Sequence, residues 1–420
     1  MRAGRGSGGA AQQPWPPMHQ RVLQQSSWPQ ARCLDGGPAV YYFRPALAHS
    51  SAPKSWVIQL GGGGQCFDED SCQEAKQTYY GSSAGWSPTY DGHAFVSPDR
   101  KLSPFADWNH AFVPQCGSDQ HLGTAGYVHA WRAVFSGRHI LDAVIGDLSA
   151  HHDLQQADTL VFTGLSAGGI AVNNLADSVQ EMVPAAKLIA LPVAANHYLP
   201  WPRIGVYTGT GKNELSDKEL VDTENIRRMH LIKNYSLPPA CLQAYPGTPS
   251  NCYFLKFALQ FMKVDVFVVQ AQTDKMYLYQ HAGFQEPGMQ LPFTVETRSF
   301  ARQWARTTSL AVDPVRKGQS VGRSGLFFPA CWLHSEFDFA GPLVRGRNFV
   351  TAAYEWLFHD GPRVYEDTCG DDIMCNPTCL DAYGMKHVSE MNYQYSGSTT
   401  KKKESASVLR RTGGRELVPG

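Results

Sequence analysis

The segment Thr159–Gly169 limits the possible folds of this chain more than any other, because an apolar run leads there into Gly-Leu-Ser-Ala-Gly-Gly and a helical pattern follows. A strand that turns sharply into a helix through Gly-x-Ser-x-Gly exposes the serine hydroxyl at the tip of the turn. The first N–H of such a helix faces the negative charge that develops on an attacked carbonyl. We therefore predict that Ser166 is a nucleophile and that Ala167 supplies one oxyanion donor. A glycine-rich turn without chemistry is the alternative.

Charge and length exclude several classes of protein. The 420 residues include 37 Lys and Arg against 37 Asp and Glu, so no net charge draws the molecule to nucleic acid or to an anionic membrane. Hydrophobic residues make up 43% of the chain, which suffices for one large core. The sequence has no run of about eighteen apolar residues, so we expect no membrane span.

The two ends of the chain differ in composition from the middle. Residues 1–30 are rich in Gly, Gln, Pro and Ser, and residues 384–420 are polar with a basic stretch. Segments this poor in apolar residues do not fold alone, so we expect disordered tails on either side of a single catalytic domain at 31–383. The start of the chain also lacks the apolar centre that a secretory signal requires.

The cysteines indicate disulfides. There are ten, and several lie close together: Cys66 with Cys72, Cys241 with Cys252, and Cys369 with Cys375 and Cys379. Zinc binding is the competing interpretation, but the sequence has no Cys-x-x-Cys pair and no His at ligand spacing beside these clusters. The pairing cannot be deduced from the sequence. Because disulfides persist in oxidising compartments, we predict a secreted protein, and the glycosylation sequon at Asn234 agrees with this.

Short apolar runs alternate with helical periodicity between the two tails. Strands are predicted at 56–60, 111–113, 160–163, 264–270 and 326–328, and helices at 130–148 and 168–182. This alternation is typical of a parallel sheet with helices on both faces. We therefore predict an α/β-hydrolase-like, doubly wound and mostly parallel sheet, cross-linked by disulfides, whose loops form the substrate pocket.

A run of four glycines, Gly61–Gly64, follows the predicted strand at 56–60. In esterases such a turn lets main-chain N–H groups approach the substrate oxygen, and Ala167 would supply the partner N–H. A phosphate-binding loop is the alternative, but no Gly-Lys-Ser/Thr follows the run.

The acid and the base of the site are expected where apolar runs end. Asp274 stands just beyond the run at 264–270, and His334 just beyond the run that begins at Leu326. The order Ser, Asp, His is that of α/β-hydrolases, in which His takes the serine proton and Asp orients the imidazole. Glu336 and Asp338 are alternative acids.

Several of these segments together resemble the pectin acetylesterase and Notum family of secreted carboxylesterases. The matching pieces keep the family's order over about residues 31–380: Cys33-Leu-Asp-Gly-Gly-Pro38, Gly61 to Cys72, Phe135-Ser-Gly-Arg138, Gly164-Leu-Ser-Ala-Gly-Gly169, Val266-Phe-Val-Val-Gln270 before Asp274, Phe328-Pro-Ala-Cys-Trp-Leu-His334 and Cys375-Asn-Pro-Thr-Cys379.

The resemblance implies a role for each matched residue. Ser166 would be the nucleophile, Asp274 the acid and His334 the base, with Gly63 or Gly64 and Ala167 as the oxyanion donors. It also implies that the cysteines form disulfides, and that the enzyme uses no metal and no organic cofactor.

The chain departs from the family beside the glycine run. Members usually have an acidic residue where Gly61 stands and an aromatic residue where Gln65 stands, and residues 191–196 lack the usual Ser-Asp-Ala-Gly. These differences concern the pocket lining and leave the catalytic positions filled.

The resemblance implies a serine esterase, and its opening segment favours O-acetyl groups on pectin-like or other polysaccharide as the substrate. Trp86, Trp108 and Trp201 are candidates for stacking on sugar rings. Three alternatives are Notum-like removal of a long acyl chain from a protein, a catalytically silent protein that binds glycan or lipid, and a peptidase with the same triad.

Overall fold

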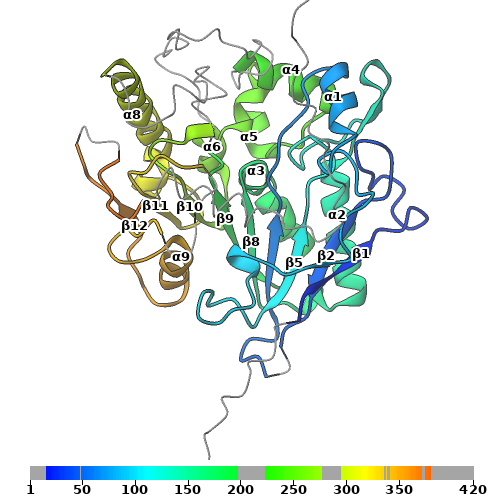
Figure 1. The fold of residues 1–420 in the computed structure, drawn as a ribbon, viewed down its shortest axis with the longest axis horizontal. Coiled ribbons are helices and arrows are strands. Elements are labelled where there is room, and N and C mark those ends of the chain that lie inside the picture. Colours follow the sequence, from blue (N-terminus) through cyan, green and yellow to red (C-terminus); the bar gives the residue numbers. More distant parts are fainter. Residues whose placement is uncertain are drawn as a thin grey trace, which may run out of the picture.

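The computed structural model describes residues 16–47, 49–196, 223–276, 295–334, 337, 341–370 and 374–379. Ten strands of this part form one sheet, in the order β12-β11-β10-β9-β8-β3-β5-β2-β1-β4. Their bounds are Met18–Val22 (β1), Val40–Arg44 (β2), Ser55–Leu60 (β3), Thr89–Tyr90 (β4), Asn109–Val113 (β5), Thr159–Leu165 (β8), Lys187–Val193 (β9), Asp265–Val269 (β10), Ser324–Phe328 (β11) and Val364–Glu366 (β12). Figure 1 shows this sheet crossing the molecule from β12 to β1.

The centre of the sheet is parallel and its β2 side is antiparallel. Every pair from β5 through β3, β8, β9, β10 and β11 to β12 is parallel. Strands β2, β1 and β4 add antiparallel pairs at one edge. The central strands read as nearly continuous apolar runs because helices cover both of their faces. The expected mostly parallel α/β fold is therefore confirmed.

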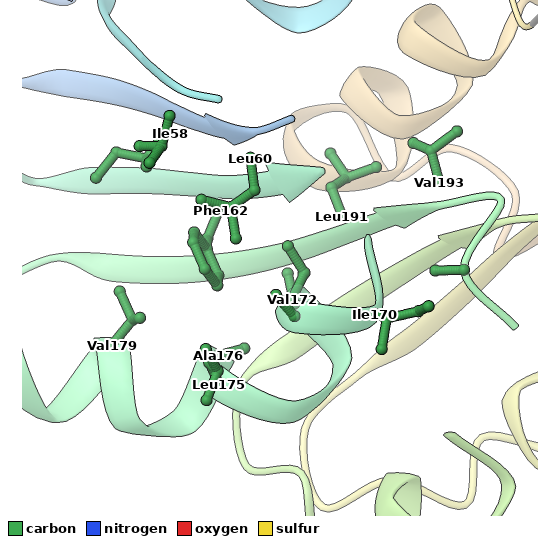
Figure 2. Packing of buried hydrophobic residues seen from close by; sticks show 14 of the residues in the cluster. Ile58, Leu60, Phe162, Ile170, Val172, Leu175, Ala176, Val179, Leu191 and Val193 are labelled. Carbon is green, nitrogen blue, oxygen red and sulfur yellow. The ribbon is translucent and has the colours of Figure 1, made fainter. Parts of the chain in front are cut away.

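The α-helices in the described part of the chain are Glu69–Ala75 (α1), Gly137–His151 (α2), Ala167–Met182 (α3), Thr223–Lys233 (α4), Pro239–Ala244 (α5), Leu255–Ala258 (α6), Val295–Lys317 (α8) and Phe349–Phe358 (α9). Of these helices, α3 packs against β3, β8 and β9, and α8 and α9 pack against β11. Helix α3 lies against β8 and β9, with apolar side chains such as Phe162 and Val172 filling the space between them (Figure 2). Because most of α3 is buried, its first turn is held in one position relative to the sheet.

The predicted elements agree with the structure except in one helix. All five predicted strands are present, as β3, β5, β8, β10 and β11, and the helix predicted at 168–182 is α3. The helix predicted from residue 130 instead begins at Gly137, since Ala133–Phe135 form a short strand, β7, paired with Gly126–Val128, β6. Arg132 has a left-handed backbone, with φ 45°, which a helix does not continue through.

The polar start of the chain also contributes to the sheet. Within the segment 1–30, which was expected to be a tail, the structure places Met18–Val22 in strand β1, paired with β2. Only Met18 of this strand is buried. Strand β1 lies between β2 and the two-residue strand β4, and few of its side chains are buried there, so composition alone did not reveal it.

All ten cysteines pair in five disulfides, which confirms that prediction. The bonds are Cys33–Cys116, Cys66–Cys72, Cys241–Cys252, Cys331–Cys379 and Cys369–Cys375. Zinc coordination by these thiols is therefore excluded. In the described ranges, no helix is both long enough and apolar enough to cross a bilayer.

Candidate active site

Ser166 lies at a sharp turn between β8 and α3. Its φ is 53° and its ψ is −117°, a backbone conformation that residues with a side chain rarely adopt. A Cβ atom on Gly164 would lie 2.4 Å from the carbonyl carbon of Gly168, and one on Gly168 would lie 2.4 Å from the carbonyl oxygen of Leu60. Only glycine fits at both positions, because strand, helix and neighbouring strand meet there.

His334 reaches Ser166 from the loop after β11. The Nε2 atom of His334 lies 2.8 Å from Ser166 Oγ. The loop is held beside the loop after β10, because Thr273 pairs with Trp332 as an isolated parallel bridge and its hydroxyl donates to the Cys331 carbonyl at 2.8 Å. The imidazole is 7% exposed, so one edge of the ring remains accessible from the site.

Asp274 orients the imidazole from the opposite side. Both of its carboxylate oxygens lie 2.9 Å from Nδ1 of His334, and the residue is fully buried. Because a carboxylate only accepts, Nδ1 carries the hydrogen and Nε2 has its lone pair free for the proton of Ser166. The structure thus brings the three predicted side chains into one chain of hydrogen bonds.

Gln270 is a member of this network that sequence reasoning missed. Its side-chain amide donates to Asp274 Oδ2 at 3.0 Å, and its Oε1 accepts the main-chain N–H of Asn196, also at 3.0 Å. The N–H of Met276 donates to Asp274 Oδ1 at 3.0 Å. The only signal in the sequence was a glutamine at the end of an apolar strand, where a polar residue that is fully buried must find partners.

The glycine run lies directly against the serine. A Cβ atom on Gly62 would be 2.9 Å from the carbonyl oxygen of Leu165 and 3.4 Å from Cβ of Ser166. Gly63 has a φ of 151° and leaves no room for a side chain beside the ring of Tyr80. Backbone without side chains can therefore approach the position that a substrate carbonyl would take.

Three main-chain N–H groups next to Ser166 are available to a ligand. Within the part of the chain that the structure describes, those of Gly63, Gly64 and Ala167 have no hydrogen-bond acceptor. Ala167 is the first residue of α3, where N–H groups have no partner inside the helix. Unpaired donors on the residue after Ser166 and on the loop that contacts it suit a developing oxyanion.

Other candidates from the sequence do not join the site. Trp86 and Trp108 are 8% and 7% exposed and belong to the hydrophobic core, so neither presents an exposed ring face to a sugar. Trp201, Glu336 and Asp338 lie outside the described residues. No cluster of three or more His, Cys, Asp or Glu side chains suited to a metal ion occurs among the residues that were placed.

Comparison with known proteins gives consistent likenesses. A family model described as Pectinacetylesterase matches residues 12–380. Pectin acetylesterase 11 of Arabidopsis thaliana is 24% identical over 373 residues, covering 83% of this chain and 89% of the plant protein. Palmitoleoyl-protein carboxylesterase notum1a of Danio rerio is 30% identical over 389 residues, covering 86% of this chain and 72% of the Danio rerio protein. The solved structure of the Wnt deacylase Notum from Drosophila has a TM-score of 0.70 at 22% identity, over 87% of this chain and 100% of that chain, which shows a shared fold.

Proposed function

Because the chain belongs to the pectinacetylesterase family, we propose that Ser166, His334 and Asp274 hydrolyse an O-acyl ester through an acyl-serine intermediate. The protein is a carboxylic ester hydrolase by this membership. One observation carries the assignment of the residues: a continuous path from the Ser166 hydroxyl to the His334 imidazole at 2.8 Å and on to the Asp274 carboxylate at 2.9 Å.

Acylation begins with attack of Ser166 Oγ on the ester carbonyl carbon. His334 Nε2 takes the hydroxyl proton, and Asp274 stabilises the imidazolium that forms. The N–H of Ala167 and that of Gly63 or Gly64 stabilise the tetrahedral oxyanion. When the C–O bond to the alcohol breaks, His334 returns the proton to the departing alkoxide.

Deacylation repeats these steps with water. His334 removes a proton from water as its oxygen attacks the acyl-serine, and it protonates Ser166 Oγ when the second intermediate collapses. The products are a carboxylic acid and the free enzyme, and no electron is transferred. The proposed chemistry needs no metal ion or organic cofactor.

We propose acetyl esters on a polysaccharide as the substrate. The family description and the plant relatives support this choice. The 30% identity to a palmitoleoyl-protein carboxylesterase supports a second candidate, removal of a long acyl chain from a protein. A series of p-nitrophenyl esters from acetate to palmitoleate separates the two, because kcat/KM falls with chain length for an acetylesterase and rises for a long-chain deacylase.

A fluorophosphonate probe tests the proposed nucleophile. The wild-type protein should become covalently labelled. The Ser166→Ala variant should not be labelled, although it should be folded and have the same melting temperature as the wild type. Folded wild-type protein that stays unlabelled and cleaves no ester would indicate a silent binding protein. Labelling that persists in Ser166→Ala would assign the nucleophile to another residue.

We further propose that the protein is secreted and that its catalytic domain includes β1. Five disulfides support an oxidising compartment. The pairing of Met18–Val22 with β2 supports a domain that begins before residue 31. Limited proteolysis tests this boundary: Met18–Val22 should remain with the protease-resistant domain, and a stable domain that begins after residue 30 would contradict the proposal.

A further inference from the structure

Four buried side chains hold the glycine-rich loop between Gly61 and Cys66. His121 Nε2 lies 3.0 Å from the Gly61 carbonyl, and Gln115 Nε2 donates to the Gly64 carbonyl at 2.8 Å. Tyr235 donates its hydroxyl to Oε1 of Gln65 at 2.9 Å, and Lys233 Nζ donates to the Cys66 carbonyl at 2.7 Å. We call these four residues the loop clamp: Gln115, His121, Lys233 and Tyr235.

The loop clamp comes from two distant parts of the chain. Gln115 and His121 follow β5, whereas Lys233 and Tyr235 lie at and just beyond the end of α4, near the top of the view in Figure 1. Lys233 joins the two parts, because its Nζ also donates to the Ser118 carbonyl at 3.0 Å. The side-chain nitrogen of Lys233 therefore connects the glycine-rich loop to the segment that follows β5.

The burial of the Lys233 side chain at this place costs folding free energy. Its side chain has no solvent exposure, and burial lowers its pKa to about 7, opposed by the charge of the equally buried Asp119. Apolar residues fill such positions at lower cost unless the nitrogen is needed. An ammonium has three N–H bonds and a neutral amine has two, so either form can satisfy both carbonyls.

The contacts fix several peptide groups of the loop. In a planar trans peptide, the C=O of one residue and the N–H of the next point in opposite directions, so holding a carbonyl also fixes the direction of the next residue's N–H. The loop clamp holds the carbonyls at the two ends of the loop, Gly61 and Cys66, and one within it, Gly64. The N–H groups of Gly63 and Gly64, which have no acceptor among the described residues, lie between these fixed points.

We propose that Lys233 and Tyr235 are positioning residues that fix the oxyanion donors of the loop. This inference rests on the proposed esterase function. Neither side chain contacts the reacting atoms. They act on catalysis through the geometry of the peptide groups between Gly61 and Cys66.

Two buried tyrosines provide a matched test. Tyr235 and Tyr253 are 3% and 2% exposed, their rings stack at 6.2 Å, and each donates its hydroxyl to a glutamine, Tyr235 to Gln65 and Tyr253 to Gln120 at 3.0 Å. Only Tyr235 thereby holds the loop. Tyr235→Phe and Tyr253→Phe should therefore lose similar stability but differ in catalysis.

The measurement must separate positioning from folding. Active serines are counted with a fluorophosphonate, and kcat is expressed per labelled serine on p-nitrophenyl acetate. Removing an oxyanion donor reduces kcat by about a hundredfold or more. We expect partial misplacement in Lys233→Met to reduce kcat per labelled serine by at least roughly tenfold with KM nearly unchanged. Tyr235→Phe should lose about threefold, and Tyr253→Phe should match the wild type.

A trifluoromethyl ketone provides a second readout, because its adduct with serine carries an oxyanion. Its inhibition constant should rise in Lys233→Met in parallel with the loss in kcat. If Lys233→Met lowers the melting temperature but keeps the wild-type kcat per labelled serine, the role is structural and the proposal is wrong. If Lys233→Met does not fold, equal kcat values for Tyr235→Phe and Tyr253→Phe overturn it. A wild-type protein that neither labels nor cleaves esters would instead refute the proposed function.

Discussion

Replacing Asp274 by Asn removes the negative charge beside His334 while the side chain keeps its shape. Two main-chain N–H groups fix which atoms donate and which accept in the hydrogen bonds around Asp274. The effect of the substitution on these hydrogen bonds can therefore be predicted. The N–H of Met276 points at Oδ1 of Asp274, and the N–H of Asn196 points at Oε1 of Gln270, whose amide then points at Oδ2. Neither main-chain group can turn around.

The asparagine side chain in Asp274→Asn therefore fits in neither orientation. With its amide nitrogen at the Oδ1 position it faces the N–H of Met276, and at the Oδ2 position it faces the amide of Gln270. Rotation of the Gln270 amide would only move the conflict to Asn196. One pair of donors remains unsatisfied in a fully buried site, which costs about 1–3 kcal/mol of unfolding free energy.

The catalytic loss follows from the charge. Two unit charges 2.9 Å apart attract by about 6 kcal/mol at an effective dielectric constant of about 20. This stabilisation of the imidazolium is lost in the variant, and about 1.4 kcal/mol corresponds to a tenfold change in rate. We therefore expect kcat to fall by about four orders of magnitude, which agrees with the loss in other triads.

The assay is kcat on a short p-nitrophenyl ester, together with urea denaturation of both proteins. The double variant Gln270→Glu/Asp274→Asn is the control for hydrogen bonding, because the introduced glutamate accepts from the Asn196 N–H and from the introduced side-chain amide. It should regain unfolding free energy but not kcat. An Asp274→Asn protein that keeps kcat within tenfold of the wild type would refute the assignment of Asp274 as the orienting acid.

Two further substitutions test other parts of the structure. Burial and the charge of Arg44 lower the pKa of His110 to about 3. Between this pH and about 6.5, the unfolded chain binds a proton at His110 and the folded chain does not. Acidification through this range should therefore reduce the unfolding free energy by up to about 1.4 kcal/mol per pH unit. His110→Gln should remove this slope in denaturation at pH 7 and pH 5, and an equal slope in both proteins would contradict the argument. Gly62→Ala, whose Cβ would lie 2.9 Å from the Leu165 carbonyl oxygen, should lower kcat/KM by about a hundredfold. Gly247→Ala, which has open space around it, is the control and should match the wild type.

Local patterns predicted β3, β5, β8, β10 and β11 but not β9, which lies between β8 and β10, and together with the family resemblance they indicated where the proposed triad side chains stand. Strands β8, β10 and β11 are buried on both faces, so their apolar runs are visible in the sequence, and the residues just past them lie at one edge of a parallel sheet. Asp274 and His334 were found by this rule, and Ser166 by its Gly-x-Ser-x-Gly turn. The same reasoning missed β1, because a strand with one buried side chain has no such run.

Hydrogen bonds between distant segments were not predictable in this way. Lys233 is 167 residues from Cys66 and Tyr235 is 170 residues from Gln65 along the chain. Their contacts depend on how α4 packs against β6 and the turn at Pro249–Tyr253, and neither propensity nor periodicity determines this. A lysine near the end of a helix more often faces solvent, so the burial of Lys233 is evident only in the folded structure.

The site therefore has two parts that are held independently and meet at Ser166. Loops after β10 and β11 bring Asp274 and His334 together, whereas the loop after β3 depends on β5 and α4 for its position. Two of the three departures from the family pattern, Gly61 and Gln65, belong to the second part, whereas the third, residues 191–196, ends at Asn196, whose N–H donates to Gln270. Proton transfer can thus be preserved while the loop changes, because the two parts share no side-chain hydrogen bond among the described residues. We infer that the preference for one acyl group over another depends on the loop and its clamp rather than on the triad.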